Sequence, residues 1–179
     1  VWLFSVQKCL GLPAGLGVLI VSPRAYERSE QLIDKSKNLC GYTNWSAQQK
    51  KMDGVYQTVC TPNALGIYLL AEKLERWNTD GGIQMLEQET AVKADMLYGA
   101  VHQFEGLANF IENEAARSQT VVCLKGSEEA IATAHTKAKE KGILLGKGYG
   151  AIKKTTLRIG NFPAITKENV EELIAVLSA

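Results

Sequence analysis

The sequence predicts an α/β protein, and three observations indicate this fold class. Short apolar runs such as residues 16–21 have the length and the Val/Ile/Leu composition of buried strands. Longer segments repeat apolar residues at intervals of three and four, which is typical of amphipathic helices. In the last third of the chain, strand-like and helix-like segments alternate. This alternation favours helices layered on a sheet.

The first third of the chain predicts two strands and a helix. Residues 2–4 and 16–21 are apolar and predict buried strands separated by a turn rich in glycine and proline. Ser22 is a candidate helix N-cap, and Pro23 suits the first helical position. We therefore expect a helix from there to about residue 37.

The middle of the chain predicts a long connection followed by two helices. Residues 38–60 are polar and lack periodicity, so we expect no regular structure there. Thr61 as cap and Pro62 as first residue predict a helix that continues to Trp77. A further amphipathic helix is expected from about 83 to 104.

The last third predicts the smaller domain. A glycine pair at 81–82 separates it from the preceding helix, and we place the domain boundary near residue 80. The expected elements are strands at 120–124, 143–145 and 155–159, a helix opened by Ser127 and ended at Gly142, and a final helix from Thr166.

Composition narrows the function classes. Twenty basic residues face nineteen acidic ones, so the net charge of +1 gives no reason to expect nucleic acid or a membrane as partner. The longest apolar run is too short to span a bilayer and is interrupted by glycine and proline. Four scattered cysteines fit a reducing, cytoplasmic compartment, where we expect them to be buried. No cysteine or histidine cluster has the spacing of a metal site.

Lys8 is the first candidate catalytic residue. It follows an apolar strand-like segment and precedes the glycine-rich turn Gly11-Leu12-Pro13-Ala14-Gly15. Burial between two apolar segments lowers the pKa of a lysine and favours an amine that can form a Schiff base. By chemistry alone, a surface lysine with its amine in solvent is the simpler interpretation.

The string Ser5-Val6-Gln7-Lys8, with the turn that follows, resembles the cofactor-lysine segment of class V aminotransferases, closest to their phosphoserine branch. These enzymes use pyridoxal 5′-phosphate (PLP). The resemblance implies that Lys8 forms the internal aldimine and shuttles the proton, and that Gln7 contacts the cofactor. It further implies that residues 1–80 close a large PLP-binding domain and that 81–179 form the small C-terminal domain.

Two further segments carry the resemblance. Cys60-Thr61-Pro62-Asn63 is similar to the family's loop that binds the PLP phosphate of a neighbouring subunit, which implies cofactor contacts from Cys60 and Thr61 and a homodimer with shared active sites. Without the resemblance, an ordinary helix cap explains Thr61. Arg158 lies inside an apolar strand; the resemblance implies that it binds the substrate carboxylate, and a structural ion pair is the alternative.

The resemblance covers only the second half of a family member. The chain begins on an apolar run at Val1 with no methionine, so we expect truncation or processing. Because the resemblance implies that the missing half supplies most of the PLP site, we expect no useful transaminase activity from these residues alone. We favour phosphoserine and 2-oxoglutarate as substrates. Gly150-Ala151-Ile152-Lys153-Lys154 looks more like the alanine–glyoxylate or serine–pyruvate branch, which is the first alternative. A truncated, non-catalytic α/β module is the second.

Overall fold

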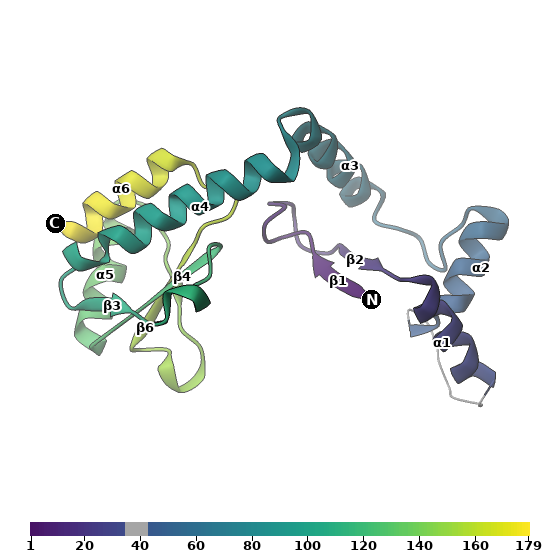
Figure 1. Cartoon of the computed structure of the whole chain (residues 1–179), viewed down its shortest axis with the longest axis horizontal. Helices are drawn as coiled ribbons and strands as arrows, with labels where there is room; N and C mark the ends of the chain where they lie inside the picture. The colour runs from purple at the N-terminus through teal and green to yellow at the C-terminus, as the bar shows by residue number, and fades with distance from the viewer. Residues whose placement is uncertain (35–42) are drawn as a thin grey trace. The chain divides into compact units, whose positions relative to one another are not determined.

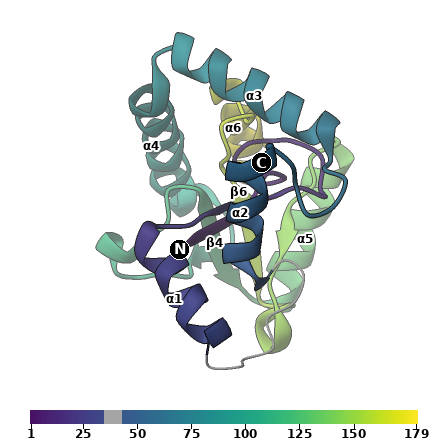
Figure 2. The ribbon, with the colours of Figure 1, turned by 90° about the vertical axis from the view of Figure 1, so that its right-hand side faces the viewer.

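The computed structural model describes residues 1–34 and 43–179, and its ribbon is drawn in Figures 1 and 2. The chain divides into two compact units. Unit 1 consists of Val1–Lys8 and Leu12–Lys73, and unit 2 consists of Cys9–Gly11 and Leu74–Ala179. Within the described ranges, every helix is too short or too polar to traverse a lipid bilayer.

Unit 1 begins with an antiparallel pair of strands, β1 (Trp2–Ser5) and β2 (Gly17–Ile20), drawn in purple in Figure 1. Both predicted strands are confirmed, but their predicted burial is wrong. The side chain of Trp2 is 64% exposed and that of Ile20 is 51% exposed. A two-stranded sheet buries its faces only when another layer covers them. No such layer covers this pair in the described part of unit 1.

Two helices follow in unit 1. Helix α1 (Pro23–Asp34) begins where predicted, and its predicted end near residue 37 lies outside the described residues. Helix α2 (Trp45–Val55) lies in the stretch that the sequence predicted to lack regular structure, so that prediction was wrong. The helix is weakly amphipathic, but the side chain of Asn44 caps it by accepting a hydrogen bond from the amide of Ala47 at 3.0 Å.

Helix α3 (Ala64–Thr79) starts two residues later than predicted. Its cap is Asn63, whose Oδ1 accepts a hydrogen bond from the amide of Gly66 at 2.9 Å. The prediction that Thr61 caps the helix was therefore wrong. The amide of Ala64 bonds to the carbonyl of Pro62 at 2.9 Å, so a tight turn separates Thr61 from the first helical turn.

The sheet of unit 2 has four antiparallel strands in the order β3-β4-β6-β5. Strands β4 (Val121–Gly126) and β6 (Thr156–Gly160) confirm two predictions. Strand β3 (Leu107–Asn109) was missed because it is too short to show alternation. Strand β5 (Gly146–Lys147) lies just after the predicted 143–145, where Ile143 and Leu145 pack against the core without joining the ladder.

Helices α4 (Gly82–Ala100), α5 (Glu128–Glu140) and α6 (Lys167–Ser178) pack on the sheet and on one another, as Figure 1 shows. The caps expected at Ser127 and Thr166 are both present. Alternate residues of β4 and β6 face these helices, and this side of the sheet forms the core. The core residues are Leu97, Ala100, Val101, Phe104, Val122, Leu124, Ile131, Ala134, Leu157, Ile159, Val170, Leu173 and Leu177.

Candidate functional site

Lys8 lies in the loop that joins β1 to β2. The amide of Val6 bonds to the carbonyl of Leu16, and the amide of Leu12 bonds to the carbonyl of Val6, each at 3.2 Å. These bonds close the base of the loop, and the side chain of Val6 is buried beneath it. Gln7 and Lys8 are both exposed. Lys8 therefore lies at the surface, which agrees with the simpler interpretation of the sequence, and its amine is accessible to a carbonyl compound.

Cys60 and Thr61 lie just before α3 and are exposed. The Thr58 hydroxyl donates a hydrogen bond to the carbonyl of Cys60, which holds the segment in a turn. Asn63 already occupies part of the helix N-terminus, because its side chain accepts from Gly66 and its carbonyl accepts from the next amide. The exposed Thr61 hydroxyl remains available to an anion. The exposure of Cys9 and Cys60 also contradicts the expectation that the cysteines are buried.

Arg158 occupies the middle of β6, with Cys123 opposite it in β4 and Gly146 opposite it in β5. Its Nε donates a hydrogen bond to the carbonyl of Lys147 at 2.8 Å. The guanidinium carbon lies 4.3 Å from the centre of the Tyr149 ring. Among the described residues, no acidic side chain forms an ion pair with Arg158. The structural ion pair considered from the sequence is therefore not found in this part of the chain.

Cys123, which lies opposite Arg158 in β4, does not neutralise the positive charge of the guanidinium. Burial raises the pKa of the Cys123 thiol, and the charge of Arg158 lowers it to a smaller extent. The thiol therefore keeps its proton at neutral pH and does not form an ion pair with the guanidinium. A cation of this kind attracts a carboxylate ligand.

Sequence reasoning missed a buried lysine, Lys93, on the core side of α4. Its side chain is 4% exposed, and Nζ donates hydrogen bonds to the carbonyls of Phe162 at 3.3 Å and Ile165 at 2.6 Å. Burial lowers the pKa of Lys93, while Glu89 raises it to a lesser degree. The helical spacing from Thr90 to Leu97, which places Lys93 among buried positions, was the available signal.

Asn161 was also missed. Its side chain is fully buried, and Nδ2 donates hydrogen bonds to the carbonyls of Thr90 at 2.9 Å and Gln119 at 2.8 Å. Asn161 directly follows β6, so these bonds tie the end of the arginine strand to α4 and to the segment before β4. Asn161 and Lys93 together anchor the backbone that directly follows β6, the strand that carries Arg158.

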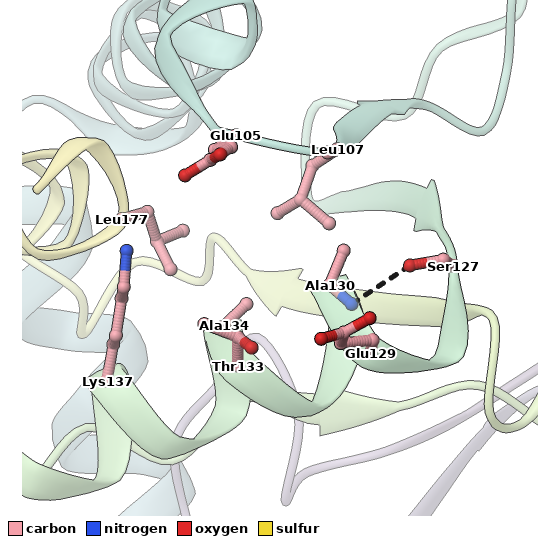
Figure 3. A pocket seen from close by; sticks show the side chains of 10 residues that line it. Glu105, Leu107, Ser127, Glu129, Ala130, Thr133, Ala134, Lys137 and Leu177 are labelled. Atoms are coloured by element: carbon pink, nitrogen blue, oxygen red, sulfur yellow. Dashed lines mark hydrogen bonds between the residues drawn. The ribbon is translucent and has the colours of Figure 1, made fainter.

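A hollow of about 380 Å³ lies elsewhere in unit 2, between the 105–107 turn, α5 and α6 (Figure 3). Glu105, Glu129 and Lys137 line it with Leu107 and other small or apolar residues. It contains none of the site residues predicted from the sequence. The described ranges also contain no group of three or more His, Cys, Asp or Glu side chains placed to hold a metal ion.

The predicted site residues are divided between the two units. Gln7, Lys8, Cys60 and Thr61 belong to unit 1, and Arg158 belongs to unit 2. The amine, the amide and the hydroxyl of unit 1 are exposed, whereas the guanidinium of unit 2 is half-buried and held by neighbouring groups.

The family model described as aminotransferase class-V matches residues 1–173. The chain belongs to the class V aminotransferase family. Phosphoserine aminotransferases from Rhodococcus opacus and Corynebacterium glutamicum are each 28% identical to it, over 97% and 99% of this chain and 46% and 47% of theirs. The chain thus spans about half the length of the curated relatives it matches.

Solved structures agree with this assignment. A phosphoserine aminotransferase from Cytophaga hutchinsonii is 32% identical and superposes with a TM-score of 0.89, over 98% of this chain and 48% of that one. An alanine–glyoxylate aminotransferase from Nostoc sp., 22% identical, shares the fold with a TM-score of 0.79 over 98% of this chain and 46% of its own. The predicted family resemblance and the α/β fold class are both confirmed.

Proposed function

We propose that this chain acts in PLP-dependent transamination, with phosphoserine as amino donor and 2-oxoglutarate as acceptor. The single observation that carries the proposal is Lys8, an exposed amine in a closed loop in a member of this family. The similarity to proteins named phosphoserine aminotransferase supports the choice of substrate.

The residues present suit the chemical groups of PLP. Lys8 offers a primary amine to an aldehyde, and the neighbouring Gln7 offers an amide. The exposed Thr61 hydroxyl, with Cys60 beside it, would contact the phosphate near the start of α3. When bound, PLP supplies an electron sink for the bond broken at the substrate α-carbon.

Two side chains would then handle the substrate. Nζ of Lys8 would accept the α-proton of the amino acid as a general base, because an accessible amine on a loop can move between partners. The planar fork of Arg158 would bind the α-carboxylate through paired N–H groups. Proton transfer and carboxylate binding are thereby assigned to different residues, and each can be tested alone.

The remaining parts of the proposal follow the family resemblance. We propose that residues 1–80 close a large PLP-binding domain, that 81–179 form the small domain, and that the enzyme is a cytoplasmic homodimer in which Thr61 serves the neighbouring subunit's cofactor. Of the two lysines that precede β6, Lys154 forms an ion pair with Glu128 at 3.2 Å, whereas Lys153 is exposed and would be the one to approach a substrate phosphate.

Trapping of the cofactor tests the role of Lys8. The chain is incubated with PLP and reduced with borohydride, and the labelled peptide is found by mass spectrometry. We expect a near-visible absorbance band that borohydride bleaches, and label on Lys8. The substitution Lys8→Ala should abolish both, whereas Lys51→Ala, which removes another exposed lysine of unit 1, should leave both unchanged. Equal labelling of the Lys8→Ala variant would contradict the proposal.

Turnover tests the reaction and the substrate. We expect no useful activity from the purified 179-residue chain, and clear turnover would contradict that expectation. Substrate preference is measured on a fusion in which this chain replaces the matched 48% of the Cytophaga hutchinsonii enzyme. Phosphoserine should be preferred over alanine and serine. A preference for alanine with glyoxylate would instead support the other branch.

A further inference from the structure

The glycine-rich loop Gly146-Lys147-Gly148-Tyr149-Gly150 has no role in the function proposed above. It begins in β5, pairs with β6 beside Arg158, and continues into a short 3₁₀ turn at Gly150–Ile152. Its tyrosine is 72% exposed, which is a high value for a large aromatic side chain. Of its residues, Gly146 and Tyr149 lie close to the side chain of Arg158.

Gly146 leaves space for the guanidinium. A Cβ at this position would lie 3.3 Å from Cβ of Arg158, 3.1 Å from its carbonyl oxygen and 3.6 Å from Nη2. Any larger residue would crowd the arginine side chain where it crosses β5. Because glycine stands opposite it, Arg158 bends across the edge strand and reaches the carbonyl of Lys147.

The loop fixes the guanidinium in two directions. The hydrogen bond from Nε to the Lys147 carbonyl sets the rotation of the planar group. The ring of Tyr149 covers one of its faces at 4.3 Å, a favourable cation–π distance. Within the described residues, neither terminal nitrogen, Nη1 or Nη2, has a protein hydrogen-bond partner. The two N–H groups that form a fork for a carboxylate are therefore left open.

The other two glycines place Tyr149. A Cβ on Gly148 would lie 2.7 Å from the carbonyl of Ile152 and would overlap the hydroxyl of Thr156, which donates a hydrogen bond to that same carbonyl. Gly150 has a φ of +53°, a left-handed conformation that L side chains rarely adopt. The backbone on both sides of Tyr149 is therefore specified by glycine, and the ring is held beside Arg158.

We propose that the 146–150 loop is a positioning device for Arg158, with Tyr149 as the positioning residue, and that it presents Nη1 and Nη2 as a preformed fork for the substrate carboxylate. This inference rests on the carboxylate-binding role of Arg158 proposed above. Preorganisation of this kind strengthens binding because less side-chain freedom is lost when the carboxylate arrives. Tyr149 acts through Arg158 and not on the reacting atoms.

Nuclear magnetic resonance of the 179-residue chain tests the orientation without any ligand. The Nε–H signal of Arg158, assigned by its loss in Arg158→Lys, should be shifted by the tyrosine ring and should exchange slowly with water. Tyr149→Phe keeps the ring and should preserve both properties, whereas Tyr149→Leu keeps an apolar side chain and should lose both. Fast exchange in the wild type, or slow exchange in Tyr149→Leu, would overturn the inference.

Titration of the 179-residue chain and its variants with 2-oxoglutarate separates this inference from the proposed function. We expect Tyr149→Leu to weaken binding about threefold to tenfold, and Tyr149→Phe to stay within about twofold of the wild type. Arg158→Lys should remove the bidentate fork and weaken binding most. Equal affinity of the wild type and Tyr149→Leu, with a large loss in Arg158→Lys, would overturn the positioning role alone. Unchanged affinity in Arg158→Lys would overturn the carboxylate role and this inference with it.

Discussion

Units 1 and 2 differ most in how they treat apolar side chains. Unit 2 encloses thirteen buried apolar residues between its sheet and helices. In the described part of unit 1, Val6 is the one buried apolar side chain, while Trp2, Leu3 and Leu65 are each more than 60% exposed. Burial of apolar surface is the main favourable term in folding. Unit 2 therefore has a core that can stabilise it as an independent domain, whereas the described part of unit 1 has no such core.

The site residues of the two units also differ in how firmly neighbouring groups hold their side chains. Arg158 projects from the sheet of unit 2, where Lys147 and Tyr149 hold its guanidinium. Lys8 lies exposed in a loop of unit 1 and forms no ion pair with the described residues. A group that recognises a substrate gains from rigidity, whereas an amine that must exchange partners needs freedom to move.

The largest expected effect comes from separating the proposed domains. Residues 81–179 expressed alone should unfold in one cooperative thermal transition, because the core lies almost entirely within them. Residues 1–80 expressed alone should show no cooperative transition. Circular dichroism and calorimetry measure both. A monomeric 1–80 fragment that melts cooperatively would show that unit 1 does not depend on contacts outside itself.

A matched pair of leucine substitutions makes the comparison quantitative. Leu124 is fully buried in the core of unit 2, and Leu65 is 69% exposed on α3. Leu124→Ala should lower the free energy of unfolding by about 2–5 kcal/mol, because it creates a cavity. Leu65→Ala should change it by less than about 0.5 kcal/mol. Urea denaturation of the whole chain gives both values, and similar losses from both would mean that Leu65 is buried in solution.

The smallest expected effect is a dependence of stability on pH in unit 2. Burial lowers the pKa of His135, and the charge of Lys147 lowers it further. The folded state therefore binds this proton less tightly than the unfolded state, whose pKa is about 6.5. Stability from His135 is fully present above that value and is lost as the pH falls toward the folded-state pKa.

This dependence is measured on residues 81–179 by urea denaturation between pH 7 and pH 5. The wild type should lose more stability over this range than His135→Gln. The control His102→Gln changes an exposed histidine of the same unit and should behave like the wild type. Identical pH profiles for the wild type and His135→Gln would show that His135 is solvated when the domain is folded.

Local patterns in the sequence predicted much of unit 2. Strands β4 and β6 were visible as apolar runs, and Ser127 and Thr166 marked two helix starts because capping depends on side chains within three residues. Helix α2 and the short strands β3 and β5 were not predicted correctly. The helix has little amphipathic pattern, and each of the two strands exists because a neighbouring strand bonds to it.

The sequence by itself indicated the family, through Ser5–Lys8, the Thr61 segment and Arg158, because these short strings resemble the family's motifs and can be read without the fold. Only the tertiary structure decided what surrounds these residues. Lys93 bonds to the carbonyls of Phe162 and Ile165, and Asn161 bonds to those of Thr90 and Gln119, all of them far away along the chain. Tyr149, in the loop that follows β5, covers the guanidinium of Arg158. Contacts of this kind depend on sheet order and on backbone closeness at Gly146, which no local pattern encodes.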